Sequence, residues 1–294
     1  MNGKPSLSSH GGAEFAPVPG VEGELKIVLA ADDARAELYL HGAQVTSWVP
    51  AGETSDRLFL SSRSRFGPGL AIRGGVPVSF PQFAAQGPLP NHGFARGSAW
   101  ALAHAGREAS GAARALLRLT DSEATRALWP HPFLAELTVT VAGRALEISL
   151  AVKNTGQTSF AFTGALHTYL RVADVRQTVV RGLRNARYKD KVLGTDGVIQ
   201  TGPELQIDRE IDRVYYAAPD DLEVREPARA MTLRAIGFPD TVVWNPGEHA
   251  GAALKDLEPG GFARMLCVEA AAARAPITLQ PSERWSGTQT LTAG

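Results

Sequence analysis

Hydrophobic and polar residues alternate in two neighbouring segments near the middle of the chain. Apolar residues occupy every second position of residues 137–141, and the same alternation runs through residues 146–153. This period of two predicts β-strands that bury one face. Ala142, Gly143 and Arg144 separate the two segments, which is the spacing of a tight hairpin. We therefore expect the two strands to pair antiparallel.

Similar short apolar runs recur along the rest of the chain, and Gly, Pro, Asn or Asp separates most of them. They cover residues 25–29, 36–40, 44–49, 115–120, 241–244, 264–269 and 277–280. No long segment carries the apolar stripe of an amphipathic helix. Because each strand needs a partner layer for its apolar face, the pattern predicts two antiparallel sheets packed face to face. We expect an all-β fold, one large antiparallel β-sandwich over residues 21–294, preceded by a flexible tail over residues 1–20.

The composition is that of a globular protein and argues against several partners. With 44% hydrophobic residues the chain can bury a core, and its 30 basic residues balance 30 acidic ones. No overall field therefore attracts nucleic acid or an anionic membrane. The longest charge-free stretch, residues 74–95, contains four prolines, so it does not predict a transmembrane helix.

Cysteine content and the first residues of the chain bear on the compartment. The single cysteine, Cys267, excludes an internal disulfide framework and a zinc site built from several cysteines. Residues 1–20 show no basic segment followed by an apolar run, so no secretory signal is predicted. Together these features favour the cytoplasm.

Two titratable residues lie in apolar runs. His167 occurs within residues 164–170, and Glu269 ends the run that begins at residue 265. Taken alone, the first fits a hydrogen-bonded core histidine and the second a buried acid paired with an arginine, because an unpaired buried carboxylate is costly. Brought into one pocket, they would serve as general acid and general base.

Arginines form a third element of a candidate site. Arg73 precedes Gly74 and Gly75, and Arg96 closes the loop that contains His92. A guanidinium binds phosphate or carboxylate through two parallel hydrogen bonds, although an ordinary turn with a solvated arginine explains the first segment equally well. The sequence has no P-loop, dinucleotide fingerprint, His-Glu-x-x-His pair or Gly-x-Ser-x-Gly elbow. We expect neither a cofactor nor a metal.

Six short motifs appear in a fixed order along the chain. They are RGGVPVSFPQF at 73–83, NHGFAR at 91–96, LHTY at 166–169, DRVY at 212–215, VWNP at 243–246 and CVE at 267–269. In combination they resemble the glucose-6-phosphate 1-epimerases, which are hexose-6-phosphate mutarotases within the aldose 1-epimerase superfamily. The resemblance extends from about residue 21 to residue 292 and implies the galactose mutarotase-like β-sandwich.

The resemblance also implies roles for individual residues. His167 corresponds to the general acid and Glu269 to the general base. The remaining substrate-binding positions are Arg73, Asn91, His92, Arg96 and Asp212. The implied partner is a small sugar phosphate, bound by a monomer without a cofactor.

The implied reaction interconverts the α and β anomers of a hexose 6-phosphate, with glucose 6-phosphate as the expected substrate. Glu269 would remove the C1 hydroxyl proton while His167 protonates the ring oxygen, so we expect an ionised Glu269 beside a protonated His167. Two alternatives remain: an aldose 1-epimerase for free sugars, and a non-catalytic sugar-phosphate-binding β-sandwich. The paired arginines argue against the first, and the matched acid and base argue against the second.

Overall fold

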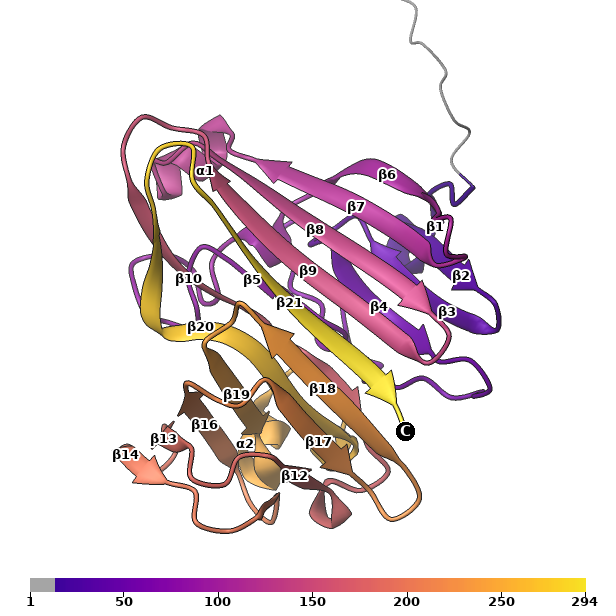
Figure 1. Ribbon diagram of the computed structural model, residues 1–294, viewed down its shortest axis with the longest axis vertical. Helices are drawn as coiled ribbons and strands as arrows, with labels where there is room; N and C mark the ends of the chain where they lie inside the picture. Colours follow the sequence, from indigo (N-terminus) through magenta and orange to yellow (C-terminus); the bar gives the residue numbers. More distant parts are fainter. Residues whose placement is uncertain (1–13) are drawn as a thin grey trace, which may run out of the picture.

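A computed structural model describes residues 14–294, which form three antiparallel sheets (Figure 1). The four-stranded sheet contains, in order, β1 (Val18–Pro19), β2 (Leu25–Ala31), β3 (Ala34–Tyr39) and β4 (Gln44–Val49). The eight-stranded sheet follows the order β14 (Thr195–Ile199), β13 (Arg187–Asp190), β16 (Ile211–Tyr216), β19 (Asp240–Asn245), β20 (Met265–Leu279), β10 (Phe160–Leu166) and β5 (Val78–Ser79), and β11 (Tyr169–Arg171) also pairs with β20.

The nine-stranded sheet is the largest of the three. Its order is β15 (Glu204–Gln206), β12 (Val179–Arg181), β17 (Asp221–Arg225), β18 (Ala230–Ile236), β21 (Arg284–Ala293), β9 (Ala145–Asn154), β8 (Phe133–Ala142), β7 (Ala113–Thr120) and β6 (Ala101–Arg107). Two short α-helices, α1 (Glu123–Leu128) and α2 (Gly247–Ala253), and four 3₁₀ turns, η1 (Val21–Gly23), η2 (Ala95–Gly97), η3 (Val175–Gln177) and η4 (Gly261–Arg264), complete the described elements.

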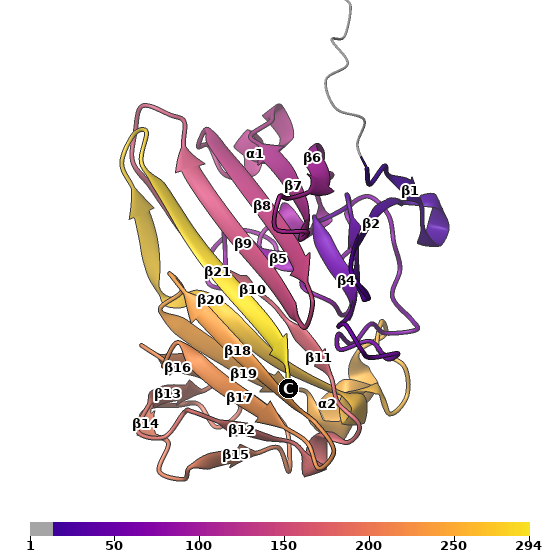
Figure 2. The same cartoon turned by 45° about the vertical axis from the view of Figure 1, so that its right-hand side comes forward.

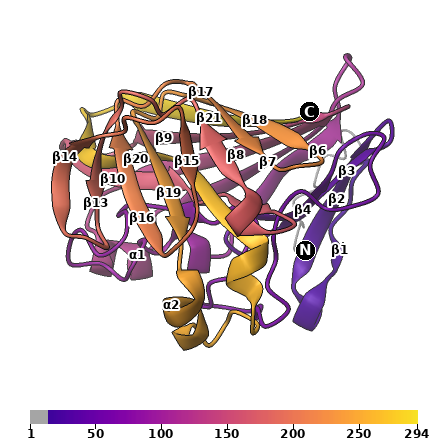
Figure 3. The same ribbon diagram turned by 90° about the horizontal axis from the view of Figure 1, so that it is seen from below.

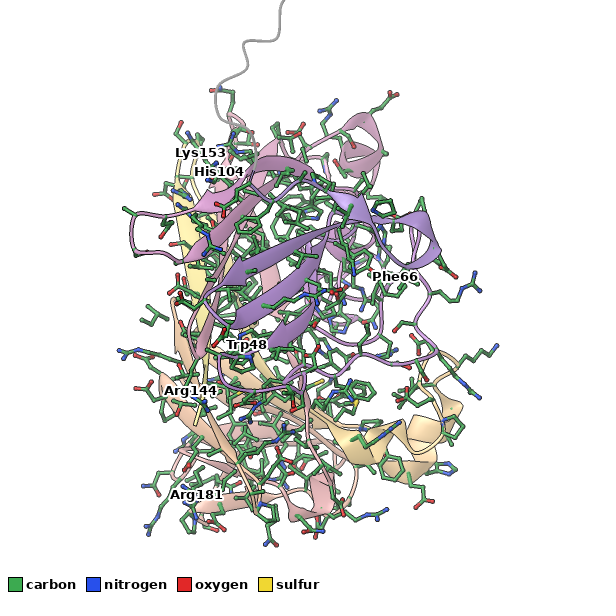
Figure 4. The ribbon with its side chains drawn as sticks, turned by 90° about the vertical axis from the view of Figure 1, so that its right-hand side faces the viewer. Trp48, Phe66, His104, Arg144, Lys153 and Arg181 are labelled. Carbon is green, nitrogen blue, oxygen red and sulfur yellow. The ribbon has the colours of Figure 1, made fainter. Side chains whose placement is uncertain are left out.

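The sheets stack in two layers. Seen from below, the nine-stranded sheet lies over the eight-stranded sheet, and α2 projects on the side away from the nine-stranded sheet (Figure 3). The four-stranded sheet packs beside the eight-stranded one, with β2 and β3 against β7 and β8 (Figure 2). Trp48 of β4 is fully buried in this second layer (Figure 4). The predicted all-β sandwich is confirmed.

The predicted hairpin is β8–β9. Ala142 pairs with Ala145, and the connecting Gly143 has a φ of 51°, a conformation that glycine adopts without steric cost. Along β8 buried and half-buried residues alternate, and the fully buried Leu137 and Val139 belong to the main core. The alternation in the sequence therefore identifies the face of β8 that packs against the other layer of the sandwich.

The predicted division of the chain near residue 270 is wrong. Residues 264–269 and 277–280 were expected to be separate strands, but residues 265–279 form the single strand β20, whose pairing with β10 shifts between Phe162 and Gly164. The first nine residues of β20 are all buried. A strand covered on both faces loses its period-two signal, and the exposed residues 274–276, which include Arg274 and Pro276, separate the two apolar runs.

The flexible tail predicted over residues 1–20 stays a prediction. Residues 1–13 lie outside the described residues, but Val18 pairs with Lys26, so the first sheet already begins within residues 1–20. The assignment of residues 21–294 to one domain stays a prediction. Among the described residues, no helix is both long and apolar enough to cross a membrane.

Candidate active site

The predicted acid and base lie next to each other. His167 follows β10 and precedes β11, so it occupies a break between two strands rather than the strand that its apolar surroundings suggested. Its backbone N–H donates to the carbonyl of Pro77 at 2.9 Å. Glu269 lies in β20, and its Oε1 is 3.3 Å from Nδ1 of His167. The two residues are only 6% and 2% exposed, so they form a buried pair.

Strand register explains which face carries this pair. Glu269 lies opposite Val242 of β19, which lies opposite Val214 of β16. Directly paired residues point to the same face of a sheet. Val214 and Val242 belong to a small apolar cluster, whereas their neighbours Val243 and Val268 belong to the main core. Glu269 therefore points away from the nine-stranded sheet, toward the side on which α2 lies (Figure 3).

A second row on the same face completes the floor of the site. Tyr169 pairs with Cys267, Cys267 with Trp244, and Trp244 with Asp212. The Tyr169 ring stacks on His167, with centroids 4.8 Å apart and planes 9° apart, and Trp244 meets both rings edge-on. These aromatic contacts restrict the orientation of the His167 imidazole.

Arg73 is held at one end of this row. Its Nη1 donates to the hydroxyl of Tyr169 at 2.9 Å, and its Nη2 lies 3.1 Å from Oδ2 of Asp256. The two glycines that follow it are required by close packing. A Cβ on Gly74 would lie 2.3 Å from the carbonyl oxygen of Phe59, and one on Gly75 would lie 2.0 Å from that of Val45. Arg73 thus enters the site from a tightly packed segment, not from a free surface turn.

His92 is fixed in one protonation form. Its Nδ1 accepts from the backbone N–H of Ala84 at 3.3 Å and lies 2.9 Å from the hydroxyl of Ser79. Burial, reinforced by the positive charge of Arg96, lowers the pKa of His92 to about 3. The imidazole is therefore neutral, and its proton resides on Nε2. The His92 and His167 ring centroids are 5.1 Å apart, so this donor borders the acid–base pair.

Arg96 and Asn91 lie across the same loop. Nη2 of Arg96 donates to the backbone carbonyl of Asn91 at 2.7 Å, and the exposed Asn91 lines a cavity of about 590 Å³ together with Lys189 and Lys191. Among the described residues Arg96 has no carboxylate within 4.0 Å, in contrast to Arg73. The positive charge of the Arg96 guanidinium is consequently less neutralised than that of Arg73.

Asp212 has a partner that the sequence did not reveal. Nζ of Lys191 lies 2.5 Å from Oδ2 of Asp212, and the backbone N–H of Lys191 donates to the Asp212 carbonyl. The two residues are far apart along the chain and meet only because β13 pairs with β16. Tyr169 and Trp244 stood in the recognised motifs without an assigned role, and Lys191 carried no signal at all.

Burial acts against the predicted ionised form of the acid–base pair. Burial lowers the pKa of His167 well below its usual range, and His92, Arg73 and Arg96 lower it further. Burial raises the pKa of Glu269 well above its usual range, and Asp212 adds to this. Loss of solvation disfavours the charged form of each partner and so favours a neutral carboxyl beside a neutral imidazole, whereas the ion pair stays a prediction. Such a pair still offers one proton donor and one acceptor.

All the predicted site residues therefore belong to one region of the outward face. The charges of Asp212 and Arg96 act on Glu269, and those of Arg73 and Arg96 act on His167. Within residues 14–294 the arrangement also contains one group of possible metal-ligating side chains, His167, Cys267 and Glu269, whose ligand atoms lie within 4.8 Å of one another. An imidazole and a carboxyl group beside arginine side chains are suited to proton transfer on a bound anionic molecule.

Comparisons with known proteins identify the family of this chain. The family model for aldose 1-epimerase matches residues 26–292. A protein of Cenchrus ciliaris named "Putative glucose-6-phosphate 1-epimerase" is 37% identical, covering 96% of this chain and 88% of its own length. A protein of the same name from Escherichia coli K12 is 40% identical over 83% and 82% of the two chains.

A solved structure shows the same fold. The crystal structure of a "putative mutarotase (YeaD)" from Salmonella typhimurium superposes with a TM-score of 0.87 at 30% identity, covering 99% of this chain and 96% of the other. The matched region contains the whole acid–base site and all three sheets. This chain is a member of the aldose 1-epimerase family.

Proposed function

We propose that this protein interconverts the α and β anomers of a hexose 6-phosphate, with glucose 6-phosphate as its substrate. The observation that supports this most directly is the buried pair of His167 and Glu269, 3.3 Å apart, with two arginines beside it. The family relationship supports the reaction, and the names of the relatives support the phosphorylated substrate.

The reaction requires only proton transfers. One residue removes the proton from the C1 hydroxyl while the other protonates the ring oxygen, so the bond between C1 and the ring oxygen breaks and an open-chain aldehyde forms. Rotation about C1–C2 presents the other face of the carbonyl, and ring closure reverses both transfers. Positioned acid and base groups typically contribute about 10²–10⁴-fold each.

We assign the first step to Glu269 as base and His167 as acid. From the neutral pair, movement of one proton from the carboxyl to the imidazole generates this starting form without any change in total charge. The stacking of Tyr169 on His167 and the neutral Nε2–H of His92 support the assignment, because they hold the imidazole in place and add a hydrogen-bond donor at the site.

We assign phosphate binding to Arg73 and Arg96, and sugar hydroxyl contacts to Asn91, His92 and Asp212. Arg96 is the stronger candidate of the two arginines, because Arg73 already contacts Asp256. That contact also favours the second candidate function, an aldose 1-epimerase for free sugars, in which Arg73 would bind a hydroxyl group.

The main experiment follows the anomers directly. Freshly dissolved α-glucose 6-phosphate is monitored by polarimetry or exchange NMR with and without the protein. We expect the protein to accelerate equilibration, and free glucose to equilibrate faster only at much higher protein concentration. Binding of glucose 6-phosphate without acceleration would identify a non-catalytic sugar-binding protein, and equal acceleration of both sugars would identify the free-sugar epimerase.

We further propose that the enzyme acts as a cytoplasmic monomer. The single cysteine supports a reducing compartment, and one chain supplies every residue assigned above. Light scattering of the purified protein tests the monomer, and a mass of two or more chains would contradict it.

A further inference from the structure

Cys267 has no role in the reaction described above, yet it lies beside the catalytic pair. It is two residues before Glu269 on β20, so both side chains point to the same face. Its Sγ, a nitrogen of His167 and a carboxylate oxygen of Glu269 all lie within 4.8 Å of one another, and all three residues are buried. The site thus contains a thiol, an imidazole and a carboxyl group in one small volume.

Two polar atoms of this cluster have no hydrogen-bond partner. They are Nδ1 of His167 and Oε2 of Glu269, on residues that are 6% and 2% exposed. Buried polar atoms without partners are uncommon and costly. Both atoms are therefore available to a ligand that enters the site.

We propose that His167, Cys267 and Glu269 bind a thiophilic divalent cation such as Zn²⁺, which excludes the sugar. Nitrogen and oxygen ligands bind zinc at about 2.0–2.2 Å, so two of them on a tetrahedral ion lie about 3.3–3.6 Å apart. The Nδ1–Oε1 distance of 3.3 Å already meets this requirement. Sγ of Cys267 lies within 4.8 Å of both partners and would move toward the ion, and a water molecule would supply the fourth ligand.

The donor set and the charges select the type of ion. Sulfur and imidazole nitrogen favour Zn²⁺ over Mg²⁺ and Ca²⁺, which prefer oxygen. Binding displaces the Cys267 thiol proton, together with any proton on the Glu269 carboxyl, to solvent, and the resulting thiolate and carboxylate balance the two charges of the ion. A neutral complex suits a buried site. The nearby guanidinium groups of Arg73 and Arg96 oppose a cation, so we expect weaker binding than at a structural zinc site.

The consequence for activity is inhibition, and this part rests on the proposed function. An ion held by His167 and Glu269 occupies the two groups that transfer protons. Glucose 6-phosphate should therefore weaken the apparent affinity for the ion, and the ion should raise the apparent KM for the sugar.

Cobalt provides a test that does not depend on activity. The full chain is titrated with Co²⁺ in metal-free buffer, and thiolate–cobalt charge-transfer absorption in the near ultraviolet is recorded. We expect this band in the wild-type protein and its loss in Cys267→Ser. Affinity for Zn²⁺, measured by competition with a chromophoric chelator, should fall at least tenfold in the same variant.

A matched control is available on the opposite layer. His104 is exposed on β6 of the nine-stranded sheet (Figure 4), so His104→Gln should bind Co²⁺ and Zn²⁺ as the wild type does. Should Cys267→Ser misfold, as judged by circular dichroism, Cys267→Ala replaces it. An unchanged cobalt spectrum or zinc affinity in the folded cysteine variant would overturn the site. Zinc binding that requires Cys267 but leaves anomer interconversion unaffected would overturn only the inhibition.

Discussion

The two faces of the eight-stranded sheet use the same strands for different purposes. On the inward face Val243 and Val268 are buried in the main core against the nine-stranded sheet. On the outward face their direct neighbours Trp244 and Glu269 belong to the proposed active site. Adjacent side chains of a strand point in opposite directions. Residues that stabilise the core therefore alternate along each strand with residues of the proposed active site. Substitutions on the two faces should therefore affect different measurements.

The largest effect is expected on the outward face. His167→Asn and Glu269→Gln remove proton transfer with little change in shape, so each should lower the rate of anomer interconversion by about 10²–10⁴-fold. Thermal unfolding should remain close to that of the wild type, and some sugar binding should persist. Polarimetry and calorimetry measure the two properties. Rates within a few-fold of wild type in either variant would contradict the acid–base assignment.

The inward face should respond in the opposite way. Leu266 is fully buried in the main core, so Leu266→Ala should lower the free energy of unfolding by about 2–5 kcal/mol. Activity per folded molecule should stay within a few-fold of wild type, because Leu266 points away from the site. Urea denaturation together with activity assays provides the measurement. A large loss of activity in the fully folded variant would show that the two faces are not independent.

The arginines test phosphate recognition within the outward face. If Arg96 and Arg73 bind the phosphate by charge-assisted hydrogen bonds, alanine at either position should cost about 1.5–3 kcal/mol of substrate binding, roughly ten- to more than a hundredfold. Free glucose should be almost unaffected. Comparing kcat/KM for the two sugars in Arg96→Ala and Arg73→Ala gives the answer. Equal losses for both sugars in both variants would favour the free-sugar epimerase.

The smallest expected effect is that of chelation. The proposed proton transfers use only side chains, so dialysis against a strong chelator should leave the rate of anomer interconversion unchanged. The assay compares chelated protein with the same sample after addition of Zn²⁺. Activity that disappears on chelation and returns with a divalent ion would show that the cluster of His167, Cys267 and Glu269 holds a catalytic metal, and would replace the inhibitory ion proposed above.

Much of the fold was predictable because its signal is local. The alternation around β8 and β9 depends on one face meeting the core, and the sequence carries that information residue by residue. The continuity of β20 was not predictable, since burial on both faces removes the alternation over its first nine residues and the exposed residues 274–276 then interrupt the apolar run. The helices α1 and α2, with six and seven residues, are too short to display an apolar stripe.

The sequence by itself determined the strand pattern, the family and the residue types of the acid–base pair. Only the tertiary structure decided that His167 and Glu269 lie 3.3 Å apart, that Lys191 contacts Asp212, and that Cys267 joins the pair. These contacts depend on register between strands distant in the chain. The protonation of the pair was likewise undetermined, because a pKa depends on burial and on neighbouring charges that exist only after the sheets have assembled.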